Sequence, residues 1–468
     1  MRAPAPKLEK GNRAMEKKRS SFSGKIGFVL SAAGASVGLG NIWRFPYLAA
    51  KHGGGIFLLI YIILAVTFGY TMIVAETALG RMTKKSPVGA FHTFGHGWQF
   101  SSAGWINAVI PMLIVPYYSV IGGWVLKYLV EYVRGNAMAV AEDGYFTAFI
   151  TGGYEAELWF CVFAAAVLVI IYLGVQNGIE RVSRFMMPVL LVIAVVIAVY
   201  AMTMPGAMAG VKYFLVPDVS HFTWMTVVQA MTQMFYSLSI AMGILVTFGS
   251  YMKDDVSIES ATLHVEVFDT GIAVLAGLMI IPAVFAFSGG DPAALNAGPA
   301  LMFVTIPKVL DSLSFPGIAG TLFFILVLFA ALTSAIALTE SAVSTFEDEL
   351  HWDRKKSTVL VGVEMILLGT LSSLGYGPLG NVTIGGMQFL DFFDFITNSV
   401  MMPIAAIATC LLLIRVTGVD AIAEEVMKDG KEFKLRPVFD FMIKYLCPFF
   451  LAVILFCSVG SVLGLISM

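Results

Sequence analysis

The chain has 468 residues, of which 58% are hydrophobic and only 13% charged, with a mean hydropathy of +0.85 and a formal net charge of −2. This composition excludes a soluble globular protein, because such proteins carry more charge and fewer apolar residues. It predicts an all-α polytopic membrane protein, and the near-zero net charge gives no reason to expect a nucleic-acid partner.

The apolar stretches can be read as membrane-spanning helices. About 30 Å of hydrocarbon takes roughly 20 apolar residues in helical conformation. Eleven stretches qualify: 25–49, 55–80, 103–133, 157–174, 183–203, 224–251, 260–288, 317–347, 357–375, 389–415 and 438–466. We therefore expect a lipid bilayer as a partner, eleven transmembrane helices and no large extramembrane domain.

Lysine and arginine are distributed unevenly between alternate loops. The tail 1–24 and the loops after the second, fourth, sixth, eighth and tenth spans carry most of them, which predicts a cytoplasmic N-terminus and, with eleven spans, an external C-terminus. Asn41, Arg44 and Pro46 interrupt the first apolar segment, so it is expected to remain as a helix of a protein in the plasma (inner) membrane. The four cysteines lie inside predicted spans without CxxC spacing, which indicates neither a disulfide nor a zinc site.

Glycine- and serine-rich runs interrupt two of the spans. One run is GASVGLGN at 34–41 and the other is SLSIAMG at 237–243. Unpaired peptide groups are tolerated in hydrocarbon only where protein or a water-filled cavity satisfies them, so each break predicts an internal binding site. The breaks fall in the first and sixth spans, as a five-plus-five inverted repeat requires. We expect a first repeat over 25–203, a second over 224–415, and the last helix with the C-terminus at 438–468.

Polar residues gather in the same spans. Ionisable and amide side chains inside a membrane are costly and are functional candidates by default. They include Asn41, Arg44, Glu76, Gln233, Glu266, Asp269, Asp391, Asp394 and Asn398. Carboxylate, amide, hydroxyl and carbonyl oxygens suit sodium, while the N-terminus of a half-helix favours a carboxylate. Glu76 is expected to hydrogen-bond free amides at one of the breaks.

The motifs at both breaks resemble one transporter family. GASVGLGNIWRFPY at 34–47, followed by three glycines at 53–55, closely resembles the first-helix signature of the neurotransmitter:sodium symporters, which include bacterial leucine and tryptophan transporters. QMFYSLS at 233–239, AALTS at 330–334 and NGIER at 177–181 match further family motifs, and the resemblance extends from about residue 22 onward.

The resemblance implies two sodium sites. The first would comprise Ser36, Asn41, Ser237 and Asp269 together with the substrate carboxylate. The second would comprise carbonyls of Gly34, Val37 and Ala330 with the hydroxyls of Thr333 and Ser334. Sodium in the first site would touch the substrate, so each would raise the affinity of the other.

Asp269 departs from the leucine transporter, which has an amide near this position. Eukaryotic relatives bind chloride in this region, where Ala273 replaces a serine or glutamate and Tyr61, Gln233 and Ser237 match other members of that site. Whether Asp269 ligates sodium or lies beside it stays open, and a protonated, hydrogen-bonded Asp269 is the alternative. A fixed carboxylate would replace a mobile anion, so chloride-independent transport is expected.

The resemblance also implies an amino-acid pocket. Gly38 occupies the position where monoamine carriers have an aspartate, so the substrate is expected to bring its own carboxylate. The substrate-binding set is Ser36, Leu39, Gly40, Ile114, Tyr118, Tyr236, Ser237, Ser239, Met242, Ser334, Ala335 and Leu338. Its side-chain end is apolar or aromatic, and Met242 can repack around different ligands. This predicts a broad range of hydrophobic and aromatic amino acids, although Met242 can also be ordinary core filling.

Two gates follow from the same resemblance. Arg44 and Asp394 would form an external ion pair above the site. Arg19 and Asp348 would form a cytoplasmic gate, with Phe22 in the place of the usual tryptophan and Tyr251 nearby. Alternating access would rock helices 1, 2, 6 and 7 against helices 3, 4, 8 and 9.

Two other classes of function carry different expectations for the sequence. A transporter-like sensor without net transport would require a degenerate cytoplasmic gate or a signalling domain, and the sequence indicates neither. An enzyme would need a nucleophile with a base or a metal cluster, whereas the six histidines are scattered over loops and helix ends. The resemblance to this family favours a monomer.

Overall fold

The computed structural model describes residues 20–290, 298–462 and 464–465. The described chain is built from helices, and its only β-type pairings are two isolated bridges, Gly54 with Pro217 and Ile384 with Met387. The all-α architecture expected from the composition is confirmed.

Eleven helical paths correspond to the eleven apolar segments. In chain order they are α1 (Lys25–Ser36) with η1 (Gly40–Arg44) and α2 (Phe45–Lys51); α3 (Gly55–Leu64) with η2 (Ala65–Gly69) and α4 (Tyr70–Thr83); α6 (Trp98–Val133); α9 (Tyr154–Tyr172); η3 (Val175–Glu180) with α10 (Arg181–Met202); α12 (Trp224–Ser237) with α13 (Ile244–Ser250); α14 (Ile258–Ser288); α16 (Pro316–Glu349); α17 (Arg354–Leu374); α18 (Phe389–Asp394) with η7 (Phe395–Met401), α19 (Met402–Leu412) and η8 (Leu413–Thr417); and α21 (Arg436–Phe441) with η10 (Met442–Leu446) and α22 (Cys447–Val462).

Nine of these paths in the described chain are long and apolar enough to cross a membrane as continuous helices. A tenth is the α1 and η1–α2 pair, which bends by 55° at its break. The eleventh is α12 with α13, whose two halves are separated by residues 238–243. The two discontinuous spans are therefore the first and sixth, as the sequence predicts.

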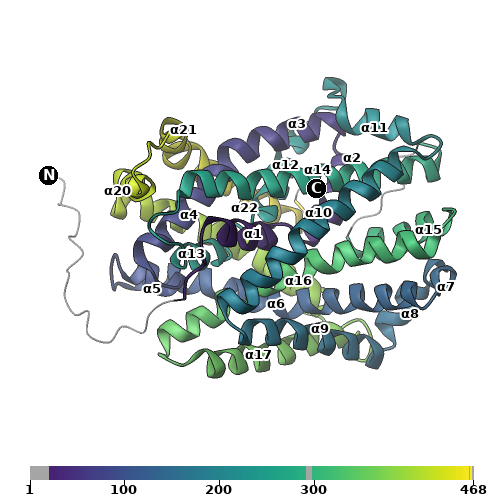
Figure 1. Ribbon diagram of the computed structural model, residues 1–468, viewed down its shortest axis with the longest axis horizontal. Coiled ribbons are helices and arrows are strands. Elements are labelled where there is room, and N and C mark those ends of the chain that lie inside the picture. Colours follow the sequence, from purple (N-terminus) through teal and green to yellow (C-terminus); the bar gives the residue numbers. More distant parts are fainter. Residues whose placement is uncertain (1–19, 291–297, 463, 466–468) are drawn as a thin grey trace.

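Short helices that the sequence analysis did not predict occupy the connections. They are α5 (Pro87–His92), α7 (Ala137–Ala141), α8 (Tyr145–Thr151), α11 (Ala207–Leu215), η4 (Val219–His221), η6 (Leu301–Thr305), α15 (Ile306–Asp311), α20 (Val419–Val426) and η9 (Met427–Asp429). They are too short for periodicity to identify them in the sequence. α5 and α20 lie toward the end of the molecule where the described chain begins, here called the N-terminal end, and α7, α8, α11 and α15 lie toward the opposite end (Figure 1).

The half-helix α1 lies at the centre of the molecule (Figure 1) and packs against α10, α14 and α16. Close backbone approach depends on small residues here. A Cβ on Gly34 would lie 3.1 Å from Cβ of Thr333, so a larger side chain would push α1 away from α16.

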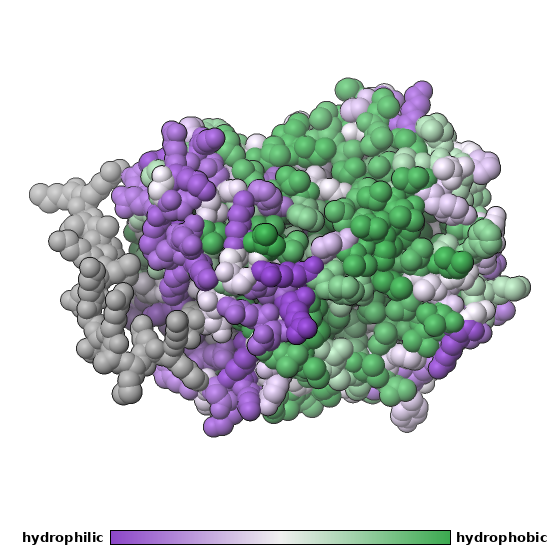
Figure 2. All heavy atoms as spheres, in the orientation of Figure 1, coloured by the Kyte–Doolittle hydropathy of each residue, from purple (hydrophilic) through white to green (hydrophobic). Residues whose placement is uncertain are grey.

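Polar and apolar surfaces are separated along the long axis. Hydrophilic side chains gather at the N-terminal end, and an apolar surface covers much of the middle and the opposite half (Figure 2). Such a broad exposed apolar surface on long apolar helices is typical of a protein surrounded by lipid.

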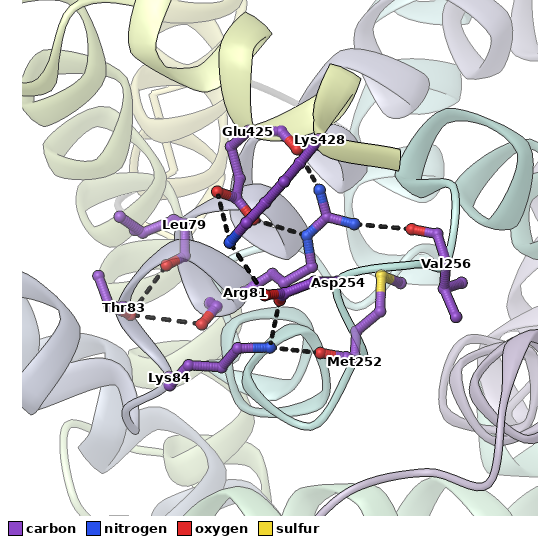
Figure 3. Close-up of polar contacts among 10 residues, drawn as sticks. Leu79, Arg81, Thr83, Lys84, Met252, Asp254, Val256, Glu425 and Lys428 are labelled. Atoms are coloured by element: carbon purple, nitrogen blue, oxygen red, sulfur yellow. Dashed lines mark hydrogen bonds and ion pairs between the residues drawn. The ribbon is translucent and has the colours of Figure 1, made fainter. Parts of the chain in front are cut away.

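A cluster of charged residues connects three segments at the N-terminal end (Figure 3). Arg81 of α4 binds Glu425 of α20 and the carbonyl of Val256, which follows α13. Around it, Asp254 forms ion pairs of 3.1 Å with Lys84 and 3.2 Å with Lys428. These contacts attach α20 to the ends of two membrane helices that neighbour the central site.

Candidate functional site

The break in the sixth span is stabilised in an unusual backbone conformation. Ser239 and Ala241 have φ angles of 54° and 60°, and Gly243 has 68°. Left-handed conformations are strained for residues other than glycine, and such strain persists where surrounding structure enforces it. These residues lie between the end of α12 at Ser237 and the start of α13 at Ile244.

Protein groups satisfy the peptide groups that the two breaks expose. Glu76 accepts a hydrogen bond of 2.8 Å from the amide of Ala241, which confirms the supporting contact expected for this carboxyl group. Gln233 donates to the carbonyl of Gly40 at 3.1 Å. Between the two breaks, Ser239 Oγ donates to the carbonyl of Ala35 at 3.1 Å. The sixth span thus provides hydrogen-bond donors for carbonyls of the first, and Glu76 of α4 provides an acceptor for the sixth, as backbone at membrane depth requires.

Asp269 of α14 is fully buried beside both breaks. Its carboxylate accepts hydrogen bonds from Asn41 Nδ2 at 2.8 Å, from Ser237 Oγ at 3.0 Å and from the hydroxyl of Tyr61 at 3.4 Å. Asn41 Oδ1 in turn accepts the amide of Gly38 at 3.1 Å. Two side chains of the expected first sodium site, Asn41 and Ser237, and a tyrosine of the chloride region therefore converge on the carboxylate of a third member, Asp269.

Ser36 contributes differently to this cluster. Its hydroxyl donates to the carbonyl of Ala32 within α1 at 3.2 Å, so the main-chain oxygen of Ser36 is the group expected to serve an ion. The donor set of the cluster is otherwise carboxylate, amide and hydroxyl oxygen, which fits a hard monovalent cation.

The expected second sodium site is also assembled from α1 and α16. Ser334 Oγ lies 3.3 Å from the carbonyl oxygens of both Gly34 and Val37. Thr333 Oγ1 lies 3.3 Å from the carbonyl oxygen of Ala330. All five residues named from the sequence thus meet in one cluster whose polar atoms are oxygens, again a set that suits sodium.

Between the two clusters lies a cavity of about 30 Å³. It is lined by Ala35, Ser36, Gly38, Leu39, Gly40, Asn41, Ile114, Tyr118, Tyr236, Ser237, Ser239, Met242, Ile244, Ser334 and Leu338. Every residue of the expected substrate set is present except Ala335, which is fully buried without reaching the cavity wall. The sequence analysis did not include Ile244 in the substrate set. Ile244 is the first residue of α13, after the break, and helical spacing does not continue across the break.

Gly38 lies at the polar end of this cavity, where its backbone closely approaches Ser334 and Tyr118. A Cβ at Gly38 would lie 2.9 Å from Ser334 Oγ and 3.1 Å from the hydroxyl of Tyr118. That hydroxyl already accepts the amide of Leu39 at 3.2 Å. Free amides and hydroxyls at the end of a broken helix favour a ligand carboxylate, and a side chain at position 38 would occupy the same space.

The expected outer gate residues flank the cavity without a direct ion pair. The guanidinium of Arg44 lies 5.2 Å from the ring centre of Tyr236. Asp394 accepts hydrogen bonds from the hydroxyl of Tyr117 at 3.1 Å and from Asn398 at 2.6 Å. No nitrogen of Arg44 comes within 4.0 Å of the Asp394 carboxylate, and the structure describes both residues.

At the N-terminal end, aromatic packing closes the interior. Phe22 is buried and makes edge-on contacts with Phe28, Phe248 and Tyr251, with ring centres 5.5 to 6.0 Å apart. Its amide also donates to the carbonyl of Tyr251 at 3.1 Å.

The charged members of the expected inner gate are only partly placed. Asp348 accepts the amide of Ser86 at 2.6 Å. Its expected partner Arg19 lies outside the described residues.

A buried acid near this end was not predicted as a site residue. Glu340 of α16 is fully buried and accepts the hydroxyl of Tyr251 at 2.7 Å. It also pairs with Arg354 through two bonds of 3.0 and 2.5 Å. The signal was present in the sequence, because a glutamate inside an apolar span is a functional candidate.

Two broken membrane helices with two clusters of oxygen atoms and a cavity beside the breaks are typical of an ion-coupled secondary transporter with a five-plus-five inverted repeat. The model of the sodium:neurotransmitter symporter family matches residues 19–141 and 147–465. The chain belongs to this family and is a sodium-dependent symporter.

Similar proteins span nearly its whole length. An uncharacterized sodium-dependent transporter of Bacillus subtilis, YhdH, is 35% identical over 423 residues, which cover 89% of this chain and 92% of the relative. The sodium- and chloride-dependent GABA transporter 2 of Bos taurus is 28% identical over 464 residues, covering 88% of this chain and 74% of the relative. The crystal structure of MhsT in complex with L-phenylalanine matches with a TM-score of 0.84 and 35% identity, covering 94% of this chain and 99% of that chain. These relatives are transporters and not enzymes.

Proposed function

We propose that this chain imports hydrophobic and aromatic L-amino acids by sodium symport through alternating access. The observation that carries the proposal is the position of Gly38, whose missing side chain lets the backbone approach Tyr118 and Ser334 closely at the polar end of an otherwise mostly apolar cavity. The substrate carboxylate would bind there, with the amides of Leu39 and Gly40. The ammonium group would bind carbonyls of the unwound segments.

The other end of the cavity selects the side chain. Ile114, Met242, Ile244 and Leu338 line it and carry no charge, so a charged substrate side chain would lose its solvation without gaining a partner. A cavity of about 30 Å³ is smaller than an amino-acid side chain, so binding requires side chains to move. Met242 is suited to this because its unbranched thioether adopts several shapes at little cost. The phenylalanine complex of MhsT supports an aromatic substrate.

Two sodium ions would accompany the substrate. One would bind beside Asn41, Ser237 and Asp269 and contact the substrate carboxylate. The other would bind carbonyls of α1 and α16 with the hydroxyls of Thr333 and Ser334. Because the first ion and the carboxylate attract each other directly, binding of either raises the affinity for the other.

Chloride would not be required. The hydroxyl groups of Tyr61 and Ser237 donate hydrogen bonds to the Asp269 carboxylate. Without this carboxylate, the same two donors would be available to a bound anion. Its fixed negative charge would balance sodium in place of chloride.

Alternating access would open the two ends in turn, with Arg44 and Asp394 closing the outer end. Asp348, Phe22, Tyr251 and the Arg19 side chain would close the inner end. The sensor alternative differs only in lacking net transport.

We further propose a monomer in the plasma (inner) membrane, with a cytoplasmic N-terminus and an external C-terminus. The hydrophilic N-terminal end supports this orientation (Figure 2). In a cysteine-free background, an impermeant maleimide applied to intact cells should label Ser314→Cys and spare Glu424→Cys. The reverse pattern would contradict the topology.

The central experiment measures uptake of labelled tryptophan, tyrosine, phenylalanine and leucine into proteoliposomes. Sodium or potassium is placed outside, and chloride is compared with gluconate. We expect uptake only with a sodium gradient, with equal rates in both anions and competition among the four amino acids. Saturable binding without uptake would favour the sensor, and uptake that requires chloride would contradict the role given to Asp269.

A further inference from the structure

A second cavity lies outside the central site, between α10, α14, α15 and α16. Its volume is about 230 Å³, compared with about 30 Å³ for the central cavity. α10, α14 and α16 belong to membrane-crossing helices. α15 lies at the end of the molecule opposite the N-terminal segment (Figure 1). The cavity is therefore in the wall of the membrane domain, and it shares no lining residue with the central cavity.

The lining of this cavity is apolar. Of the seventeen described residues that line it, Tyr200 carries the only side-chain hydroxyl and none is charged. Small side chains leave the space open, since Ala201, Ala283 and Ala319 come from three different helices of the wall. Neither end of an amino-acid zwitterion would find an ionic partner here, which excludes a second site for the transported substrate.

Water is equally unsuited to this cavity. A buried water needs two to four polar partners, which this lining does not supply. A hydrocarbon occupant, in contrast, would give the wall atoms the dispersion contacts that an unfilled space denies them.

The mouth of the cavity faces the surface that lipid would cover. Val196 of α10 is 52% exposed, and Ile318 and Phe315 at the start of α16 are 64% and 68% exposed. Figure 2 shows a continuous apolar surface on the face that α10 crosses in Figure 1. A hydrocarbon chain can thus enter sideways from the bilayer without crossing water.

We propose that this cavity binds one acyl chain of a membrane phospholipid, whose headgroup stays at the bilayer surface near α15. The three alanines set the width of the site, and Val196, Ile318 and Phe315 form its entrance. The proposal depends on neither the substrate nor the sodium assignments.

The test uses proteoliposomes that contain phosphatidylglycerol with a photoreactive diazirine in one acyl chain. After illumination and proteolysis, mass spectrometry locates the adducts. We expect adducts concentrated on the facing segments of α10, α14 and α16. Ala283→Phe and Ala319→Phe should each reduce that yield at least about fivefold, because the ring fills the space of the chain. Ala166→Phe places the same ring on the exposed face of α9, away from this cavity, and should leave the yield unchanged.

Two further measurements keep the result interpretable. Size exclusion and thermal unfolding identify any variant that fails to fold, in which case Ala319→Ile provides a smaller filling. Native mass spectrometry of the detergent-solubilised protein should show one retained phospholipid in the unaltered chain and its loss in the filled variants. Adducts on α10, α14 and α16 that are no more frequent than on α9, or that persist in the filled variants, would overturn the proposal.

Discussion

Arg81 is fully buried, and its guanidinium binds Glu425 through both the side-chain carboxylate, at 2.6 Å from Nε, and the main-chain carbonyl (Figure 3). Nη1 donates to the carbonyl of Val256 at 2.7 Å. One side chain therefore joins α4, the segment after α13 and the connecting helix α20. Because Tyr251 in that same segment accepts the amide of Phe22, the cluster also supports the aromatic closure at the N-terminal end.

We expect Glu425→Ala to destabilise the protein by about 3 kcal/mol, because it leaves the buried Arg81 charge without its partner. The neighbouring Glu424 is exposed, so Glu424→Ala is the matched control and should have little effect. Denaturant or thermal unfolding in detergent provides the measurement. Equal effects of the two substitutions would show that the buried ion pair does not stabilise the fold.

Asp254 gives the outer part of this cluster a pH dependence. Burial raises the pKa of this carboxyl group, but hydrogen bonds and attraction from Lys84 and Lys428 outweigh burial and lower the pKa below its ordinary value of 3.8. The contribution of ionised Asp254 to the free energy of unfolding should be fully present above pH 3.8, and it should be lost as the pH falls through the lowered pKa. It should be small, because the Asp254 side chain is half exposed.

The measurement is the midpoint temperature of unfolding across this pH range, with Asp254→Asn beside the unaltered protein. The midpoint temperatures of the two proteins should differ at neutral pH and become equal in acid. In a Lys84→Met, Lys428→Met background the difference should be much reduced. A difference that is unaffected by removing both lysines would contradict this origin.

Asp269→Asn should make transport sensitive to chloride. The substitution removes the fixed charge while leaving Tyr61 and Ser237 as donors for an anion. We expect uptake in gluconate to fall by about tenfold and chloride to restore part of it. Initial rates in proteoliposomes at matched sodium provide the measurement. Full activity of this variant in gluconate would show that the carboxylate is not needed.

Gly38→Ala should reduce substrate affinity by about tenfold or more, because the new methyl group would crowd Ser334 and Tyr118. Gly271→Ala on α14 is the control, since no atom lies within 4 Å of its added Cβ. Equilibrium binding of labelled amino acid gives the affinities, and circular dichroism checks the fold. Unchanged binding by Gly38→Ala would place the substrate carboxylate elsewhere.

Met242→Phe should shift selectivity toward smaller side chains, because a rigid ring cannot repack as the thioether does. We expect the ratio of tryptophan to leucine uptake to fall by about tenfold. Met242→Leu, which keeps a similar volume, should change that ratio less. Competition assays measure both. An unchanged ratio in Met242→Phe would support the alternative in which Met242 is core filling.

Some features of the site were predictable because local sequence encodes them directly. The break at 237–243 contains glycine and serine in an apolar run, and the structure ends α12 at Ser237 and starts α13 at Ile244. The family motifs also placed Gly38, Tyr118 and Ser334 in one pocket, where the structure brings them together.

Other features depend on packing between distant segments. The separation of Arg44 from Asp394 and the exclusion of Ala335 from the cavity wall depend on where whole helices lie. Helix α20 has only eight residues, and its Glu425 binds Arg81 of α4, which lies 344 positions earlier in the sequence. The sequence analysis did not predict this helix, because its position depends on that distant contact. A contact between residues so far apart produces no local sequence pattern.

The sequence by itself determined a membrane protein with two broken helices, since apolar length and glycine-rich interruptions act locally on whether a segment can span a bilayer. It also determined the family, through motifs that extend along the chain. Only the tertiary structure decided which oxygens face Asp269, which side chains enclose the central cavity, and where the apolar cavity between α10, α14, α15 and α16 opens. Those outcomes depend on the distances between side chains from separate helices, which are set when the helices pack against one another.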